Sequence, residues 1–583
     1  MLIHLETNLR IPMRDGVELA ADLYLPETGA AVPALVERTP YDKQRGQARN
    51  FALEARRAAE AGFAVLVQDT RGRYASGGTF RPFFDEAQDG ADTLAWVARQ
   101  PWGSRSIGMI GGSYGGLAQW AAAGKAGDGL GAIAPFMTAA DVGGGWAYRG
   151  GALQLGFLLT WAITTLVPGE AMRRQREGRE GPSPAEVGAA VDGIGRYFEF
   201  APTLDVPLPG EPSYYREWLA HPPGDVYWQE AGHLPDAAPP SLTIAGWHDI
   251  FLAGALDDYA IVRRQAPSRG PLPRLVVGPW AHRVTEGSFP ERGYGRSAGT
   301  EASDLGGLQI AWLASVLNPR SRLAPKLQSV APVRLFVMGS NEWREFADWP
   351  PAEVMPHSLY LDSHGRANTA RGDGLLLWTE PATDGEDSYV YDPLDPAPTI
   401  GGGTFLPGIE VGANSGPRDT SAAERREDVL CYTSAPLAEP VELVGPVELV
   451  LFVASSAEDT DFTGRLVDVA PDGRAEHVTE GILRARYRES IRAPQLMRPG
   501  RCYEIRIDLG ATATRFAAGH RLRLEVSSSN FPRFDRNTNT GGDIASESVG
   551  SWRQARNSVL HGQSRPSRLV VWLVPCGAGG EPR

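Results

Sequence analysis

One short segment of the sequence has the residue pattern of an activated serine. In GMIGGSYGG, the residues Gly111, Ser113 and Gly115 satisfy the pattern G-x-S-x-G. A serine held in a sharp turn between a strand and a helix needs small neighbours, because bulk on either side would collide with the backbone. We predict a strand at Ile107–Ile110 and a helix at Tyr114–Gly124. The alternative is an ordinary turn in a glycine-rich chain. The predicted strand before Ser113 and the predicted helix after it favour a nucleophile instead.

A serine hydroxyl is a poor nucleophile at neutral pH, so it needs an imidazole base and a carboxylate that orients the base. In chains with this turn, the acid and then the base follow the serine, each in the loop after a strand. Asp249 and His282 both directly follow predicted strands. His248 is a rival base without a strand of its own. Asp257 and Asp258 are rival acids on a predicted helix, where we expect a solvated face.

The negative oxygen that forms when a serine attacks a carbonyl group needs hydrogen-bond donors. One is expected from the backbone N–H of Tyr114, which follows the nucleophile. The other should come from the loop ERTPYDK after an early strand, where the phenol of Tyr41 is the candidate. From the residues alone, Tyr41 could equally be a core or loop-anchoring side chain.

Metal and cofactor chemistry find little support in the sequence. There is no H-E-x-x-H motif, no Cys/His cluster, no closely spaced carboxylate set and no clear dinucleotide fingerprint. The cysteines, Cys431, Cys502 and Cys576, are too few and too widely spaced for a disulfide framework. We therefore expect a cofactor-free hydrolase without a metal, in a reducing compartment.

The residues that could do chemistry lie within a pattern of alternating strands and helices. Apolar strand-like runs are predicted at Ala34–Val36, Ala64–Val67, Ile107–Ile110, Ser241–Ala245 and Arg274–Val277, and a helix follows Asp85. Such a rhythm is typical of a parallel sheet. Helical and Pro/Gly-rich segments interrupt it, and after about Pro332 many short β-rich runs follow, beginning with VRLFVMG. We predict an α/β domain at 1–140 and 240–331, an insertion at 141–239 and an all-β sandwich or jelly roll at 332–583.

Composition limits the classes of partner. The 583 residues carry a net charge of −13 and are 42% hydrophobic and 22% charged, which excludes a disordered or collagen-like chain and disfavours nucleic acid and anionic membranes. The N-terminus lacks the features of a secretory signal, so we expect a cytoplasmic protein. The uncharged stretch Gly151–Pro168 is broken by Gln and Thr and is shorter than the roughly 20 apolar residues of a spanning helix. It is better explained as a buried or pocket-lining helix.

Stretches that resemble one known protein family occur along the whole chain. They are IPMRDGVELAADLYLP, RTPYDK, VLVQDTRGRYASGGTF, IGMIGGSYGG, AGWHDIF, VVGPWAH, VRLFVMGSNEWREFADWP, EDTDFTGRLVDV and VSSSNFPRFDRNTNTGG. In these stretches the sequence resembles the cocaine-esterase-like (CocE/NonD) hydrolases, which are related to the X-Pro dipeptidyl-peptidases and the α-amino-acid ester hydrolases. The resemblance implies an α/β-hydrolase domain with an inserted helical cap and a C-terminal all-β jelly-roll domain.

The same resemblance implies functions for particular residues. Ser113 would be the nucleophile, Asp249 and His282 would complete the triad, and Tyr41 with the Tyr114 amide would form the oxyanion hole. The acyl pocket would include Trp161, Phe251, Phe405 and Leu406, and aromatic walls would favour a flat acyl group such as benzoyl.

Two related activities are less favoured. The family's amino-ester hydrolases carry a carboxylate cluster beside the triad acid, whereas Ile250, Phe251 and Leu252 follow Asp249 here. X-Pro peptidases commonly carry an additional N-terminal helical domain, for which the 110 residues before the predicted turn leave no room.

We therefore expect a serine carboxylesterase acting on a small-molecule ester with an apolar or aryl acyl group. Amide hydrolysis, by an X-Pro dipeptidyl-peptidase-like enzyme or an acylase of β-lactam side chains, stays open as an alternative. A non-catalytic binding protein with a hydrolase fold is the alternative of another class. A homodimer stays open as well.

Overall fold

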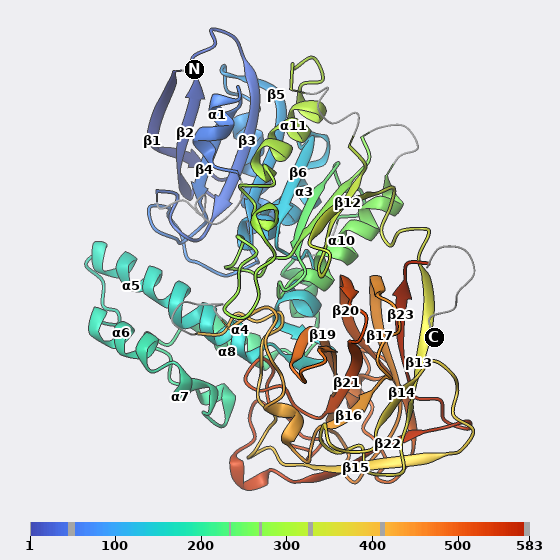
Figure 1. Cartoon of the computed structure of the whole chain (residues 1–583). Coiled ribbons are helices and arrows are strands. Elements are labelled where there is room, and N and C mark those ends of the chain that lie inside the picture. The colour runs from blue at the N-terminus through green and yellow to red at the C-terminus, as the bar shows by residue number, and fades with distance from the viewer. Residues whose placement is uncertain are drawn as a thin grey trace.

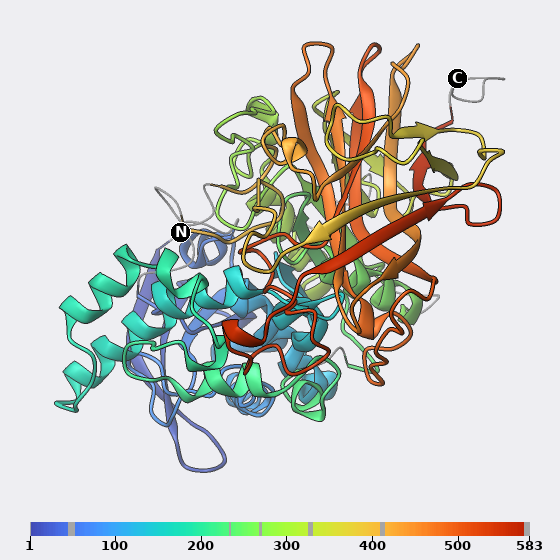
Figure 2. The same ribbon diagram turned by 90° about the horizontal axis from the view of Figure 1, so that it is seen from below.

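The computed structural model describes residues 2–44, 53–232, 235–266, 271–323, 330–407 and 414–575. Figure 1 shows a sheet flanked by helices, a second body made mainly of strands, and a group of helices beside them. Figure 2 shows the same arrangement from below, with the long strands of the second body standing beside the helices.

The first body is built on a sheet of ten described strands in the order β1-β2-β4-β3-β5-β6-β9-β10-β11-β12. Their bounds are β1 Ile3–Pro12, β2 Glu18–Pro26, β3 Val32–Thr39, β4 Ala64–Asp69, β5 Gly103–Gly112, β6 Ala132–Phe136, β9 Leu242–Gly246, β10 Arg274–Gly278, β11 Val333–Val337 and β12 Glu342–Phe346. The strands from β4 through β11 pair in parallel, and the two edges end in antiparallel pairs. Strands β3 and β4 are buried at every position, as expected for parallel strands covered on both faces.

Helices cover the two faces of this sheet. Helices α1 (Ala55–Glu60) and α11 (Leu305–Leu317) share one apolar core with one face. Helices α2 (Glu86–Val97), α3 (Tyr114–Ala126) and α10 (Leu252–Gln265) pack on the other. The alternating strands and helices predicted from the sequence are thus confirmed, and the carboxyl ends of β5, β9 and β10 meet at one edge.

The helices between β6 and β9 form the insertion that the sequence predicts. They are α4 Leu155–Trp161, α5 Val167–Arg176, α6 Pro184–Asp192, α7 Gly195–Phe198, α8 Ser213–Ala220 and α9 Val226–Glu230, with a short hairpin of β7 Tyr148–Arg149 and β8 Ala152–Leu153. A π-helical turn at Ala162–Leu166 joins α4 and α5 into one continuous helix. This helix is long and apolar enough to cross a membrane, yet 67% of its most apolar window is buried inside the protein. Core helices of globular proteins have the same property.

The second body, called the β unit below, is a set of eleven described strands that pair antiparallel with one exception. They are β13 Met355–Asp362, β14 Leu375–Leu377, β15 Gly385–Tyr391, β16 Leu430–Thr433, β17 Val441–Ser455, β18 Asp461–Val469, β19 Ala475–Arg484, β20 Tyr503–Phe516, β21 Arg521–Ser527, β22 Ala555–His561 and β23 Arg568–Leu573. Their inward side chains form a separate apolar core.

One assignment from the sequence is wrong. The strand VRLFV was predicted to begin the β-rich C-terminal part, but β11 pairs in parallel with β10 and β12 pairs with β11, so both belong to the first sheet. A short apolar run is typical of strands in both sheets. Only the strand with which it pairs shows to which sheet it belongs.

Candidate active site

Ser113 occupies the turn between β5 and α3, as the sequence predicts. Its backbone has φ 54° and ψ −123°, a region that residues with a side chain rarely adopt and that often marks functional sites. Three residues on, a Cβ on Gly116 would lie 2.5 Å from Cγ2 of Thr138, so glycine is needed for α3 to pack this closely. The turn holds the hydroxyl at the carboxyl edge of the sheet, 5% exposed.

Three side chains far apart in the sequence meet at this edge. Nε2 of His282 lies 3.0 Å from Oγ of Ser113, and Nδ1 of His282 lies 2.8 Å from Oδ2 of Asp249. Asp249 follows β9 and His282 follows β10, and because these strands pair in parallel their following loops emerge side by side. The imidazole is 4% exposed and the carboxylate 1%. This geometry suits proton transfer from the serine to the imidazole.

The orientation of Asp249 is fixed from its other side. Its Oδ1 accepts a hydrogen bond from the backbone N–H of Phe251 at 2.8 Å, in a tight turn that leads into α10. Because one oxygen is committed to the backbone, the other faces the imidazole. The carboxylate can therefore select the tautomer that leaves Nε2 free to accept the serine proton.

Tyr41 and the first turn of α3 place two donors beside Ser113. The Ser113 side chain, the Trp161 side chain and the backbone N–H of Tyr114 lie close enough to the Tyr41 phenol to lower its pKa, against the larger effect of burial. Burial raises the pKa of Tyr41 to about 12, so the phenol keeps its proton at neutral pH and can donate it in a hydrogen bond. The Tyr114 side chain is not one of these two donors, because its hydroxyl donates a hydrogen bond to Glu86 at 3.0 Å.

The four side chains suggested for the acyl pocket lie in one buried apolar cluster, and two of them contact the His282 ring. The rings of Phe251 and Phe405 meet the His282 imidazole edge-on at 5.2 and 5.3 Å. Trp161 and Leu406 belong to the same cluster and are 2% and 7% exposed. The structure thus gathers these side chains around the candidate nucleophile and base.

Further aromatic side chains of this cluster were not singled out from the sequence. Trp161 stacks between Phe157 and Trp218, with ring centroids 5.7 Å away on each side, and Trp146 lies 4.3 Å from Phe251. The only signal for them is the density of aromatic residues in the insertion. An aromatic residue on a helix is equally typical of an ordinary hydrophobic core. The sequence therefore could not assign these residues to the site.

The rival residues have other environments. Nε2 of His248 lies 3.1 Å from the Tyr294 hydroxyl, and burial lowers the pKa of His248 to about 3, so it stays neutral. Asp257 is exposed, as predicted. The prediction of a solvated face is wrong for Asp258, which is 5% exposed and accepts a hydrogen bond from the Ala140 N–H at 2.8 Å, because α10 packs that side against the loop after β6.

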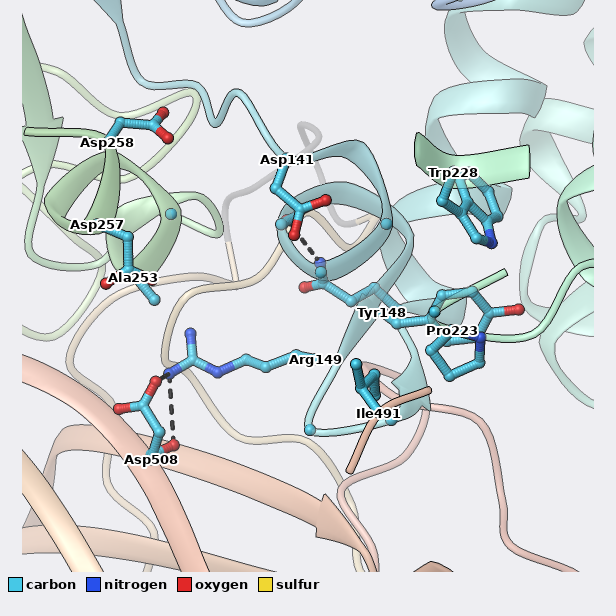
Figure 3. A pocket seen from close by; sticks show the side chains of 18 of the residues that line it. Asp141, Tyr148, Arg149, Pro223, Trp228, Ala253, Asp257, Asp258, Ile491 and Asp508 are labelled. Carbon is cyan, nitrogen blue, oxygen red and sulfur yellow. Dashed lines mark hydrogen bonds and ion pairs between the residues drawn. The ribbon is translucent and has the colours of Figure 1, made fainter. Parts of the chain in front are cut away.

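A cavity of about 960 Å³ lies between the insertion, α10 and the β unit (Figure 3). Asp141, Asp257 and Asp508 line it, and Arg149 reaches across toward Asp508 at 3.5 Å. Ser113, His282, Asp249 and Tyr41 are not among its lining residues, although Ile250, next to Asp249 in the chain, is one of them. The cavity is therefore distinct from the site around Ser113.

Among the described residues, no group of three or more His, Cys, Asp or Glu side chains has an arrangement that could hold a metal ion. Cys431 and Cys502 are free thiols, and Cys576 lies outside the described residues.

A nucleophile turn on a mostly parallel sheet, with a buried imidazole and carboxylate at the same edge, defines a serine hydrolase of the α/β-hydrolase type. Residues 15–283 match the X-Pro dipeptidyl-peptidase (S15 family), and residues 326–570 match the X-Pro dipeptidyl-peptidase C-terminal non-catalytic domain. The chain belongs to this family, and within it to the cocaine-esterase-like hydrolases.

Individual relatives match over almost the whole chain. The sequence is 39% identical to cocaine esterase of Rhodococcus sp. (strain MB1 Bresler), over 97% of this chain and 98% of that one. The structure resembles an aminopeptidase from the marine sediment archaeon Thaumarchaeota archaeon, with a TM-score of 0.78, 25% identity and coverage of 98% and 96%. An α-amino acid ester hydrolase shares the fold, with a TM-score of 0.77, 23% identity and the same coverage.

Proposed function

We propose that this serine hydrolase is a carboxylesterase that cleaves small-molecule esters with apolar or aryl acyl groups through an acyl-enzyme on Ser113. The observation that carries the proposal is the continuous hydrogen-bonded series from the Ser113 hydroxyl through His282 to Asp249, at 3.0 and 2.8 Å. The 39% identity to a cocaine esterase over nearly the full chain supports an ester as substrate.

In the first half of the reaction, His282 Nε2 takes the proton of Ser113 as the oxygen attacks the ester carbonyl. Asp249 stabilises the resulting imidazolium. The Tyr41 hydroxyl and the Tyr114 N–H then donate hydrogen bonds to the carbonyl oxygen, which carries the negative charge. When the intermediate collapses, the imidazolium returns its proton to the departing alcohol, and the acyl group stays on Ser113.

In the second half, the same imidazole takes a proton from a water molecule that attacks the acyl-enzyme. The second tetrahedral intermediate uses the same two donors. It collapses to a carboxylic acid, and the proton held by His282 returns to the serine oxygen. The products are one alcohol and one acid, and the protein returns to its starting state.

The surroundings of the imidazole favour flat apolar acyl groups. Phe251 and Phe405 contact His282 by their edges, while Trp161 and Leu406 complete an apolar wall. Aromatic walls pack well against a planar ring and give a charged acyl group no compensation for lost water. We therefore expect benzoyl and similar acyl groups to be preferred.

Amide substrates are the second candidate, because one structural relative is an aminopeptidase and the family model is that of X-Pro peptidases. Comparing the hydrolysis of phenyl benzoate with that of an Xaa-Pro anilide separates the two. An esterase cleaves the first much faster than the second, and the reverse ranking would contradict the proposal.

Labelling with a fluorophosphonate separates an enzyme from a binding protein with a hydrolase fold. Only an activated serine reacts, so the wild-type protein should take up one label per chain, and Ser113→Ala should take up none. Ser315→Ala, which removes a hydroxyl bonded to the Trp312 carbonyl in α11, is a matched control that should label normally. Label on Ser113→Ala, or none on the wild type, would contradict the assignment.

The proposal also covers the organisation of the chain. We propose that residues 1–140 and 240–331, extended through β12, form the hydrolase domain, that 141–239 form the cap, and that the remaining C-terminal strands form a jelly roll. We further propose a cytoplasmic enzyme, with a homodimer as the assembly to test by light scattering.

A further inference from the structure

The turn that carries the nucleophile contains only one large side chain. Its residues are Gly111, Gly112, Ser113, Tyr114, Gly115 and Gly116. Glycine has the most backbone freedom of any residue and has no side chain by which the rest of the protein could hold it. The Ser113 hydroxyl faces His282. The Tyr114 side chain is therefore the one in this turn that can fix the backbone N–H proposed as an oxyanion donor.

Both the ring and the hydroxyl of Tyr114 are held by their surroundings. Tyr114 is 0% exposed, and its ring stacks on Phe83 with the ring centroids 5.6 Å apart. The hydroxyl accepts a hydrogen bond from the backbone N–H of Phe83 at 2.8 Å and donates one to Oε1 of Glu86 at 3.0 Å. Burial raises the pKa of Tyr114 well above its usual value, so the phenol keeps its proton and is the donor to Glu86.

The backbone that meets this hydroxyl is itself in an unfavourable conformation. Phe83 has φ 81°, in the left-handed region that residues with a side chain rarely adopt. Such a conformation persists only where the surrounding structure holds it, and it is often found at functional sites. The contact between Phe83 and Tyr114 is therefore one that the fold maintains at a cost.

Glu86 also contacts the strand that leads to the other proposed oxyanion donor. It is 2% exposed, and its Oε2 lies 2.6 Å from Nη1 of Arg38 in β3. The same Nη1 donates a hydrogen bond to the Glu86 backbone carbonyl at 2.9 Å, and Arg38 is 0% exposed. Tyr41 follows Arg38 by three residues, just beyond the carboxyl end of β3. One oxygen of Glu86 thus binds the residue that carries the first donor, and the other binds the strand that carries the second.

We propose that Glu86 is a positioning residue of the oxyanion hole. Through Tyr114 on one side and Arg38 on the other, it sets the distance between the Tyr114 N–H and the Tyr41 hydroxyl. The inference deepens the proposed function and rests on it, because it takes these two groups as the donors. Such donors stabilise the transition state where they lie about 2.7–3.1 Å from the developing oxyanion, so a small displacement of either one lowers the rate. Glu86 acts through its neighbours and does not touch the substrate.

Tyr114→Phe is the sharpest variant, because it removes only the hydroxyl and keeps the ring, the backbone N–H and the ion pair between Glu86 and Arg38. We expect kcat for phenyl benzoate to fall about tenfold, less than for the loss of a whole donor, with an unchanged KM. The Ki of phenylboronic acid should rise about tenfold as well, because its tetrahedral adduct with Ser113 places an oxygen at the oxyanion position. Active-site titration ensures that only folded enzyme is counted.

Two variants of Glu86 separate its hydrogen bond from its size. Glu86→Met has a similar length but no oxygen for the Tyr114 hydroxyl, so its kcat should fall at least as far as that of Tyr114→Phe. Glu86→Gln keeps an oxygen that can accept this hydrogen bond, so it should recover part of the loss. If Glu86→Met does not fold because Arg38 loses its counter-charge, Tyr114→Phe and Glu86→Gln still test the proposal.

Asp89→Asn is the matched control. Asp89 is a second buried carboxylate of α2, which pairs with Arg71 at 2.6 Å and lies 3.8 Å from Nη2 of Arg38. The variant loses a buried charge beside the same arginine and keeps the acceptor of the Tyr114 hydroxyl. We expect it to unfold at a lower urea concentration than the wild type, with kcat, KM and the Ki of phenylboronic acid unchanged.

Four results would overturn the proposal. They are a wild-type kcat in Tyr114→Phe, equal losses of kcat in Tyr114→Phe and Asp89→Asn, no recovery in Glu86→Gln, and a rise of KM that accounts for the whole loss of kcat/KM. A wild-type protein that does not cleave phenyl benzoate would count against the proposed function instead. The rate of fluorophosphonate labelling then compares the same variants, because the phosphoryl oxygen also occupies the oxyanion hole, so the two failures are distinguishable.

Discussion

Two clusters of buried polar side chains, one at the edge of the first sheet and one inside the β unit, are each organised around a buried carboxylate. At the sheet edge, Ser113, His282 and Asp249 form a linear series, in which His282 in the middle contacts both of the others. Inside the β unit, Glu480 accepts hydrogen bonds from Arg465 and Asn530, each at 2.9 Å, and pairs with Arg533.

The clusters differ in whether a proton can move. In the first, a hydroxyl faces a ring nitrogen of an imidazole, which can accept its proton, and the carboxylate can stabilise the charge that results. In the second, the guanidinium groups of Arg465 and Arg533 hold the pKa of Glu480 well below its usual range, although burial opposes them. Burial and charge alone therefore do not identify a catalytic group; a transferable proton does.

The two clusters adjoin through one glycine. A Cβ on Gly403 would lie 3.0 Å from the Asp249 carbonyl and 3.5 Å from Nη2 of Arg533. The β unit thus packs against the backbone of Asp249 at this point. Variants of the two clusters can show whether this contact transmits an effect on catalysis or only on stability.

The largest effect is expected from Ser113→Ala, because it removes the nucleophile. We expect kcat to fall about 10⁶-fold, leaving only the rate that binding and the oxyanion donors support. The free energy of unfolding should stay within about 0.5 kcal/mol of the wild type. Steady-state kinetics with phenyl benzoate and urea unfolding measure the two quantities, and retained turnover would remove Ser113 from the mechanism.

Asp249→Asn should lower kcat about 10⁴-fold, because an amide holds the imidazole in the wrong tautomer. Asp258→Asn is the matched control: Asp258 is also buried, and burial raises its pKa well above the usual range, so an uncharged amide resembles its native state. Its kcat should change less than about threefold. Equal losses in both variants would show that the kinetics report folding and not the triad.

Glu480→Gln should destabilise the protein by about 3–5 kcal/mol, because Arg465 and Arg533 would lose their shared counter-charge. The kcat of the folded fraction should stay close to that of the wild type, since no proton moves through this cluster. Urea unfolding with active-site titration measures both. A large fall in kcat without a loss of stability would mean that the β unit takes part in catalysis through Gly403.

Tyr41→Phe removes one oxyanion donor and should lower kcat by about 10²–10³, with little change in KM. Tyr389→Phe is the control, since it removes a buried hydroxyl of the β unit that pairs with Ser528 at 2.7 Å. An unchanged kcat in Tyr41→Phe would exclude the Tyr41 hydroxyl as a donor to the oxyanion.

The smallest effect concerns pH. Burial raises the pKa of Glu525 from 4.5 to about 7, against the opposing charge of Arg465. A carboxyl group whose pKa is higher in the folded state stabilises the protein fully below pH 4.5, and this contribution is lost as the pH rises through about 7. Between these values the unfolding free energy should fall by about 1–3 kcal/mol. Glu525→Gln should reduce this dependence of the unfolding free energy on pH. If the dependence stays the same in the variant, another titrating group causes it.

Much of the site could be predicted from the sequence because local patterns encode it. The turn GGSYGG requires small residues wherever it occurs, and the order of Asp249 and His282 after their strands follows from how such sheets are wound. The strands β3, β4, β5, β9 and β10 were likewise visible as apolar runs. These features depend on spacing along the chain, which the sequence contains.

Other features depend on partners that spacing does not reveal. The sequence could not show that β11 joins the first sheet, that Asp258 is buried under α10, or that Trp146, Phe157 and Trp218 surround Trp161. Each of these results from contacts between segments that are distant in the chain.

The amino-acid sequence alone determined the chemistry available to this protein, since a serine in a strained glycine turn, an acid and a base follow one another in an order that a parallel sheet can bring together. The sequence also favoured Asp249 and His282 over their rivals, but only the tertiary structure brings them into contact with Ser113. The reason is that hydrogen bonding acts over about 3 Å, and such distances between residues 113, 249 and 282 exist only once the sheet has formed.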